Sequence, residues 1–321
     1  MALEIAMIGG GRLAEVMARL LSAAKGDIRV RHWARNPEVR EKFGERYPSF
    51  SRHDSVQDAT KNARIVVLAV PTHALEEVAT RYGEVATADQ VVLHACRGAG
   101  PGFVLPHKVI RGVTCARKIV TLGGPLHGRD LGSGRSLAAA VASRFPQAID
   151  AVRAMTAGTP VKLHPTQDIV GVEVAGAMSN VWALASGMSD ALELGDTARG
   201  LLLTRGLVEA QRVGLALGAD AATFAGIAGL GELIPRKVSS MERHQEAGAE
   251  LARGKSLAGS ILEGVTTAHA AVELSNKRRL KLPLLRAVAS TLENPATARA
   301  ALESVLALDL DDLVLPRPAV R

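Results

Sequence analysis

A glycine-rich turn stands between an apolar run and a helical pattern near the start of the chain. The segment IAMIGGGRLAEV contains Gly9-x-Gly11-x-x-Ala14. Gly9 permits a tight turn, Gly11 lets a pyrophosphate approach the backbone, and the small side chain of Ala14 lets a helix pack closely on a strand. The free N–H groups and the positive dipole end of that helix would face the phosphates. The turn therefore predicts a strand–turn–helix unit that binds a dinucleotide.

The first half of the chain alternates apolar runs with helical patterns. The runs expected to be strands are LEIAMIGGG, DIRVRHWARNP, ARIVVLAVP, DQVVLHACRG and RKIVTLGGP, and SLAAAVAS is a further candidate. ARIVVLAVP is almost entirely apolar, as a strand buried on both faces of a parallel sheet should be. Alternating strands and helices indicate a doubly wound sheet. We expect a Rossmann-like α/β domain with a mostly parallel sheet over residues 1–166.

The pattern changes after residue 166. Helical patterns separated by glycine-bearing loops cover residues 168–189, 197–217, 242–253, 261–276 and 283–292. Gly254 and Asn294-Pro295 have the character of helix stops. The second domain, residues 167–321, is therefore predicted to be entirely helical, and the final PRPAVR is expected to be disordered.

Charge and composition narrow the class of ligand. The formal charge of +7 suits an anionic small molecule, with a scattered basic surface as the alternative. Nucleic acid is disfavoured because the sequence has no basic stripe interleaved with aromatic residues. The N-terminal apolar stretches are too short to span a membrane, and Glu4 disfavours a signal peptide. Cys96 and Cys115 are expected to be buried small hydrophobes, and the nine histidines lack ligand spacing, so no metal site is predicted. A cytoplasmic protein is the default expectation.

The end of the second predicted strand indicates which dinucleotide is bound. Sites for NAD usually place an acidic side chain there to bind the ribose 2′-hydroxyl, whereas this chain has HWARN. The guanidinium of Arg35 could pair with a 2′-phosphate, with a solvated surface arginine as the alternative. The sequence thus favours NADP over NAD, and both stay candidates.

Several further segments stand in the two halves of the chain: LAVPTHAL and GGPLHGRDL in the first, and DIVGVEVAGAMSNVWALASGMSDAL, TRGLVEAQRVGLALGADAATFAGIAGLGEL and ILEGV in the second. Together with GGGRLAEV they resemble one family, the NAD(P)-dependent glycerol-3-phosphate dehydrogenases of the bacterial, soluble type. GGGRLAEV falls on its glycine loop, LAVPTHAL resembles the loop after its third-strand region, and GGPLHGRDL loosely resembles a Gly-Pro-Ser-Phe-Ala segment. The similarity is strongest in the segments of the second half. The resemblance implies a homodimer and reversible hydride transfer between a nicotinamide and C2 of a three-carbon phosphate.

The resemblance also implies roles for single residues. Arg35, inferred above from the end of the second predicted strand, is added to them. The candidate cofactor contacts are then Gly9, Gly11, Arg12, Leu13, Arg35, Pro71, Arg97, Arg243 and Glu263. The candidate catalytic or substrate-binding residues are Arg97, Ser179, Asn180, Glu232, Arg243 and His244.

The positions that handle protons depart from the family pattern. A lysine in a Gly-Ala-x-Lys-Asn segment falls on Ser179, while its neighbour is kept as Asn180. A second lysine, in a Lys-Gly pair, falls on Arg97, whose guanidinium is a poor proton donor or acceptor. An aspartate falls on Glu232, which is one methylene longer, and a misplacement of about 1 Å can cost on the order of 10²-fold in rate.

Further positions also include both residues that differ from the family pattern and residues that match it. A Ser-Arg-Asn motif falls on Glu242-Arg243-His244 and keeps only its arginine. A threonine falls on Arg236 and an asparagine on Thr197, whereas the late cofactor contact survives as Glu263-Gly264. The expected cofactor contacts are therefore retained, while the expected substrate and proton-transfer residues have changed.

Three interpretations stay open. The chain is a dehydrogenase that acts on an altered, anionic substrate, a dehydrogenase of the usual substrate with unusual residues, or a non-catalytic nucleotide-binding or regulatory protein. The first is favoured. His127 and His244 are candidates for the lysine's role because histidine serves well as a general acid or base, with a loop or surface histidine as the alternative for each. Asp130 and Asp190 are weaker candidates.

Overall fold

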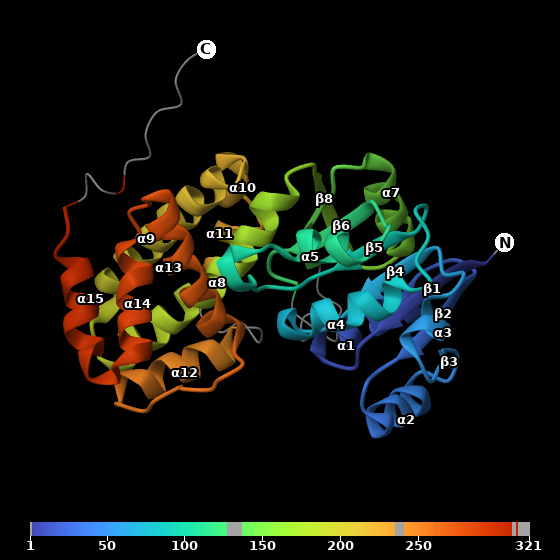
Figure 1. The fold of residues 1–321 in the computed structure, drawn as a ribbon, viewed down its shortest axis with the longest axis horizontal. Helices are drawn as coiled ribbons and strands as arrows, with labels where there is room; N and C mark the ends of the chain where they lie inside the picture. The colour runs from blue at the N-terminus through green and yellow to red at the C-terminus, as the bar shows by residue number, and fades with distance from the viewer. Residues whose placement is uncertain (1, 127–136, 235–240, 310–312, 314–321) are drawn as a thin grey trace, which may run out of the picture. The chain divides into compact units, whose positions relative to one another are not determined.

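The structure is a computed structural model that describes residues 2–126, 137–234, 241–309 and 313 (Figure 1). The chain divides into two compact units. Unit 1 consists of Met1–Arg97 and Val104–Glu173, and unit 2 of Gly98–Phe103 and Val174–Arg321. The chain therefore passes from one unit to the other three times, and a short excursion at 98–103 belongs to the second unit.

Unit 1 is built on an eight-stranded sheet, counted over the described residues, with the order β3-β2-β1-β4-β5-β6-β7-β8. The strands are β1 (Leu3–Ile8), β2 (Ile28–Trp33), β3 (Ser51–Arg52), β4 (Ile65–Leu68), β5 (Val91–His94), β6 (Lys118–Gly123), β7 (Leu137–Ala142) and β8 (Val161–Thr166). Neighbouring strands are parallel except β6 and β7, which are antiparallel. The mostly parallel sheet is confirmed, and SLAAAVAS supplies its antiparallel strand.

Two strands were not expected from the sequence. β3 is only two residues long and pairs with β2 through Ser51 and Arg52. β8 lies at the edge of the sheet, and its residues are all partly or fully exposed. Because the strand is not buried, its sequence need not form an apolar run. By contrast, every residue of β4 is buried, as its apolar sequence predicted.

Helices accompany the strands of unit 1 along the chain (Figure 1). They are α1 (Arg12–Ala23), α2 (Pro37–Arg46), α3 (Val56–Thr60), α4 (Thr72–Gly83), α5 (Pro106–Val113) and α7 (Pro146–Met155). The core joins side chains of the sheet and of α1, including Met7, Leu20, Leu93 and Val120, all of which are buried. Cys96 is buried as expected, but the same expectation for Cys115 is wrong because that thiol is exposed and donates to the Ala86 carbonyl.

Unit 2 is helical, as predicted. Its helices are α8 (Ile169–Ala191, which begins in unit 1), α9 (Gly195–Ala216), α10 (Ala221–Ala225), α11 (Leu230–Leu233), α12 (Glu242–Ala252), α13 (Glu263–Arg278), α14 (Pro283–Glu293) and α15 (Ala298–Leu306), with short 3₁₀ turns η1 (Pro101–Phe103) and η2 (Pro295–Thr297). The five helices expected from periodicity are all present. The short α10 and α11, and α15 after the predicted stop at Asn294-Pro295, were not expected. The terminal PRPAVR lies outside the described residues.

Glycines let α8 and α12 approach closely. A Cβ added at Gly187 would lie 1.9 Å from the Gln245 carbonyl oxygen, and one at Gly248 would lie 2.1 Å from the Leu184 carbonyl oxygen. Neither position can carry a side chain without separating the helices. Among the described helices α8 alone is long and apolar enough to cross a membrane, and its apolar window is wholly buried within the protein. Its composition is therefore explained by packing.

Candidate functional site

The glycine turn joins β1 to α1 in unit 1. Gly9 has φ +134°, and a Cβ there would lie 2.2 Å from the Ala69 carbonyl oxygen, so only glycine fits. Gly11 is exposed, and a Cβ there would meet no atom within 4 Å. Ala14 is completely buried against the sheet. The turn is thus closed toward the protein and open toward solvent, which is what the approach of a phosphate requires.

A buried histidine supports this turn from the neighbouring strand. The Nε2 atom of His32, on β2, lies 2.8 Å from the Gly9 carbonyl oxygen, and its ring stacks on Phe43 at 4.2 Å between centroids. A carbonyl can only accept, so Nε2 carries the proton. Burial lowers the pKa of His32, although the hydrogen bond to Gly9 opposes this shift. The lowered pKa keeps the ring neutral. The sequence reasoning missed His32, because a histidine in an apolar strand is not a recognised cofactor signal.

The N-terminus of α1 follows the turn directly. Gly11 is its N-cap residue and no side chain caps the helix. Arg12 is exposed and Leu13 is partly buried, both in the first turn. Backbone N–H groups at such an N-terminus favour anions. Pro71 is the N-cap residue of α4 and follows β4. Since β1 and β4 are parallel neighbours, Pro71 and the glycine turn lie at the same edge of the sheet.

Arg35 lies just beyond the end of β2, at this same edge of the sheet. Its side chain is 74% exposed and its Nη1 atom lies 4.0 Å from Glu77 Oε2. An exposed ion pair of this kind contributes no more than about 1 kcal/mol, so the guanidinium can turn to a ligand at little cost.

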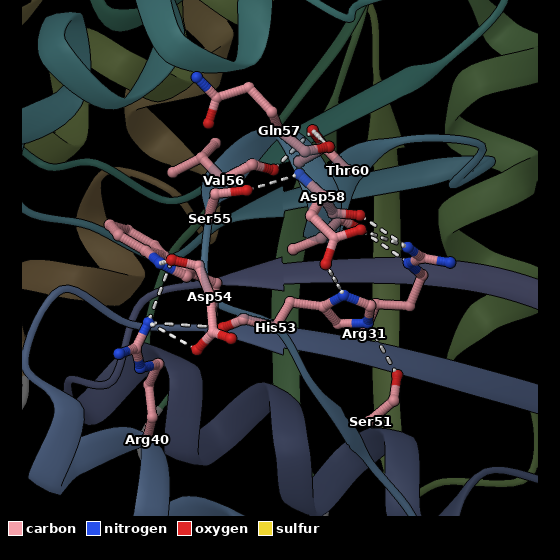
Figure 2. Close-up of polar contacts among 12 residues, drawn as sticks. Arg31, Arg40, Ser51, His53, Asp54, Ser55, Val56, Gln57, Asp58 and Thr60 are labelled. Carbon is pink, nitrogen blue, oxygen red and sulfur yellow. Dashed lines mark hydrogen bonds and ion pairs between the residues drawn. The ribbon is translucent and has the colours of Figure 1, made fainter.

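A second arginine near the end of β2 is held in place, as Figure 2 shows. Arg40 Nη1 donates to the Asp54 carbonyl at 3.3 Å and lies 3.7 Å from the Asp54 carboxylate. Nearby, His53 Nδ1 lies 2.7 Å from Asp58 Oδ2 on α3, and Arg31 on β2 donates to the Asp58 carbonyl at 2.6 Å. The contacts with Asp54 fix Arg40 to the protein, which leaves Arg35 as the better candidate for a ligand phosphate.

Arg97 follows β5, which is parallel to β4. Its side chain is partly buried, and its Nη2 atom donates to the Gly124 carbonyl oxygen at 2.8 Å. Gly124 comes directly after β6. Unit 1 therefore brings the glycine turn, Arg35, Pro71 and Arg97 to the carboxyl ends of adjacent parallel strands, the edge where open α/β sheets bind ligands.

In unit 2, the side chain of Ser179 is directed into its own helix. Ser179 is 1% exposed, and its hydroxyl donates to the Gly176 carbonyl at 2.8 Å, one turn earlier in α8. A hydroxyl bonded in this way carries no accessible base. Asn180, next to it, is also buried.

Three helices meet beside Asn180. A Cβ added at Gly264, on α13, would lie 2.9 Å from the Asn180 backbone oxygen, so α8 and α13 are in close contact. The Gly264 N–H donates to His244 Nε2 at 3.1 Å, which brings in α12. His244 is buried, contrary to the surface alternative, and its Nε2 lone pair is occupied by a backbone donor. Asn180, His244 and the segment Glu263-Gly264 thus lie together.

The remaining candidates are dispersed over unit 2. Glu232 is buried on the short α11, whereas Arg243 on α12 and Thr197 on α9 are exposed. Asp190 is paired with Arg199 at 3.0 Å on the surface. His127, Asp130 and Arg236 lie outside the described residues. Among the residues that the structure describes, no three His, Cys, Asp or Glu side chains form a group that could hold a metal ion.

Comparison with known proteins gives matches in both halves. Residues 168–303 match the family described as NAD-dependent glycerol-3-phosphate dehydrogenase C-terminus, and residues 4–98 match NADP oxidoreductase, coenzyme F420-dependent. The chain is 31% identical to a glycerol-3-phosphate dehydrogenase [NAD(P)+] of Bacillus mycoides, covering 94% of this chain and 95% of that protein. It is 33% identical to one of a Thermoanaerobacter species over 76% of each.

A solved structure has the same fold. Glycerol-3-phosphate dehydrogenase of Coxiella burnetii superposes with a TM-score of 0.85 at 24% identity, covering 96% of this chain and 99% of that one.

Proposed function

The chain belongs to the NAD(P)-dependent glycerol-3-phosphate dehydrogenase family, and we propose that it transfers hydride between NADP or NAD and C2 of a small, anionic hydroxy or keto compound related to glycerol 3-phosphate. NAD or NADP is the cofactor that the family uses. The observation that carries the proposal is the glycine turn, where the backbone is closed toward Ala69 at Gly9 and open at Gly11.

Residues of unit 1 fit the cofactor that the family implies. The N-terminus of α1 receives the pyrophosphate, where the absence of a Cβ at Gly11 leaves space for it. Arg35 pairs with a 2′-phosphate and favours NADP, because its exposed contact with Glu77 is easily exchanged. When bound, the cofactor supplies the hydride, and the protein's part is to hold and orient it.

Arg97 supplies positive charge to the substrate. A guanidinium stays protonated in proteins, so it polarises a carbonyl or binds a phosphate but does not exchange the substrate's proton. Ser179 does not replace the family's lysine in proton transfer, because its hydroxyl is bonded to Gly176. His244 is not ready for that role either, because its Nε2 atom accepts from Gly264. Activity on dihydroxyacetone phosphate itself is therefore expected to be low.

The first test is the oxidation of NADPH and NADH by the purified protein. Dihydroxyacetone phosphate is compared with a panel of anionic keto compounds, both phosphorylated and carboxylated. Turnover on the order of 1 per second or faster with one of them supports the proposal. Tight NADPH binding without turnover on any compound refutes it.

A non-catalytic nucleotide-binding or regulatory protein is the second candidate. The hydrogen bond of Ser179 supports this candidate. Ser179 stands where the resemblance implies a lysine, and its bonded hydroxyl does not exchange a proton with a substrate. Binding of NADPH by calorimetry, combined with inactivity toward the whole panel, is the result that this candidate predicts.

The assembly and location of the protein are further proposals. A homodimer follows from the resemblance, and a cytoplasmic location is the default expectation from the sequence. Light scattering on the purified protein tests the first, and a mass equal to one chain contradicts it. Fractionation of the source cells tests the second.

A further inference from the structure

A fully buried carboxylate in unit 1 contacts two histidines from different elements. Glu173, early in α8, has its Oε1 atom 2.9 Å from His94 Nε2 and its Oε2 atom 2.5 Å from His107 Nδ1. Oε1 also accepts the backbone N–H of His107 at 2.9 Å. The three side chains are at most 5% exposed. A charge buried this deeply is tolerated only where donors surround it.

The carboxylate is ionised. Burial raises the pKa of Glu173, but the contacts with His107 and His94 outweigh this effect, so the pKa lies below its ordinary value. An ionised carboxylate can only accept, so each ring nitrogen that faces it carries a proton. The Nε2 atom of His94 therefore carries a proton, and it faces Glu173 Oε1 at 2.9 Å without hydrogen-bond alignment.

The other nitrogen of His94 is an acceptor. Its Nδ1 atom lies 3.3 Å from the backbone nitrogen of Cys96, whose N–H donates to it. A proton on Nδ1 would place two donors face to face. His94 is thus neutral with its proton on Nε2, a tautomer selected by Glu173 on one side and by Cys96 on the other.

The hydrogen bond at Cys96 fixes the backbone next to Arg97. Cys96 is held a second time because its Sγ atom donates to the Val70 carbonyl at 3.4 Å. The next residue, Arg97, then directs its Nη2 atom to the Gly124 carbonyl at 2.8 Å. We infer that Glu173 and His94 are positioning residues that, through the Cys96 N–H, hold the Arg97 guanidinium in place against the loop after β6. The inference deepens the proposed function, on which the role of Arg97 rests.

Two substitutions at His94 separate the two contacts of its ring. In His94→Asn, the amide oxygen stands near the Nδ1 position and keeps an acceptor for Cys96, but the contact with Glu173 is lost. In His94→Gln, the amide nitrogen stands near the Nε2 position and keeps a donor for Glu173, but the acceptor for Cys96 is lost. We expect kcat/KM to fall on the order of 10²-fold in His94→Gln and by less than about threefold in His94→Asn.

His107→Asn is the matched control. It alters the other ring on the same carboxylate, keeps a donor near the Nδ1 position and makes no contact with Cys96. We expect it to lower the Tm as the His94 variants do, with unchanged NADPH affinity and kcat/KM. If His94→Asn and His94→Gln lose kcat/KM equally, in proportion to their Tm, the positioning role is wrong.

Nuclear magnetic resonance tests the inference without turnover. Long-range ¹H–¹⁵N spectra of protein labelled at histidine should show His94 with a protonated Nε2 and an accepting Nδ1. The His94 signals are assigned by their disappearance in His94→Asn. The Arg97 Nε–H signal, assigned with Arg97→Lys, should shift in His94→Gln and stay in place in His94→Asn. A proton on His94 Nδ1, or an Arg97 signal indifferent to both variants, overturns the inference. A wild-type protein that turns over nothing refutes the proposed function and leaves these spectra to decide the positioning role.

Discussion

The glycine turn of unit 1 and the Ser179 region of unit 2 use their polar groups in opposite ways. At the turn, Gly11 and the N-terminus of α1 present backbone toward open space. Around Ser179 the polar groups are bonded within the protein, the serine to Gly176 and His244 to Gly264. The difference teaches that a site for a nucleotide can be built from backbone shape, whereas proton transfer depends on single side chains.

The sharpest way to break this comparison is at the glycines. Gly9→Ala places a Cβ 2.2 Å from the Ala69 carbonyl oxygen at a positive φ, so we expect NADPH affinity to fall by about 10²-fold or more and the protein to lose about 1–3 kcal/mol of stability. Calorimetric titration and thermal unfolding measure both.

Gly11→Ala is the matched variant, because a Cβ there meets no protein atom within 4 Å. It should weaken NADPH binding while the Tm stays unchanged. Equal losses of Tm in the two variants would mean that Gly11 serves the fold rather than the ligand.

A second prediction concerns the buried polar groups of unit 2. Both carboxylate oxygens of Glu209, on α9, accept backbone N–H groups at the start of α14, at 2.7 and 2.9 Å. Burial raises the pKa of Glu209 to about 7, partly offset by those two hydrogen bonds. A raised carboxyl pKa means that the folded protein binds the proton more tightly. Stability is therefore highest below the unfolded pKa and falls, by about 3 kcal/mol, as pH rises from about 4.5 to about 7.

Urea unfolding at several pH values between 5 and 8 measures that slope. Glu209→Gln should remove most of it, whatever its effect on stability at one pH. A slope that persists in Glu209→Gln would assign it to another group. Glu173 changes the stability in the opposite sense and at lower pH. Because its pKa is lowered, its contribution to stability is lost only as the pH falls below about 4.5.

The third prediction introduces lysines at Ser179 in unit 2 and at Arg97 in unit 1. The double variant Ser179→Lys, Arg97→Lys should gain at least about tenfold in the reduction of dihydroxyacetone phosphate, because a lysine can act as a general acid or base where a guanidinium cannot. Ser179→Ala is the control, and should change kcat/KM by less than about twofold because the serine hydroxyl is bonded within its own helix. No gain in the double variant would mean that the substrate pocket differs more deeply from that of the family.

The smallest effect is expected at Arg35. Arg35→Ser removes an exposed charge proposed to meet the 2′-phosphate, so NADPH affinity should fall about fivefold while NADH affinity stays the same. Parallel fluorescence titrations with the two cofactors measure the change. Equal losses for both cofactors would show that Arg35 contributes general positive charge and does not select NADP.

Local patterns predicted the fold well where neighbours in sequence decide it. The apolar run of β4 and the turn at Gly9 follow from a few adjacent residues, and both are present. β3 and β8 were missed because their pairing with distant strands, rather than their own sequence, makes them strands. Likewise, the position of His244 could be anticipated, but not the bond that occupies it, because Gly264 lies 20 residues from His244 along the chain.

The three crossings of the chain between the units bear on how the protein folds during synthesis. The excursion at 98–103 packs on α13, where Ala99 N donates to Thr267 Oγ1 across 168 residues and Gly102 N donates to the Glu273 carboxylate. Ribosomes add about 5–20 residues per second, so this segment waits roughly 10–30 s for its partner helix to be made. Unit 1 can close around its sheet in that interval, with residues 98–103 held out as an unsatisfied loop. The docking of residues 98–103 therefore waits for α13, and a nascent chain stalled before that helix should still expose this loop to protease.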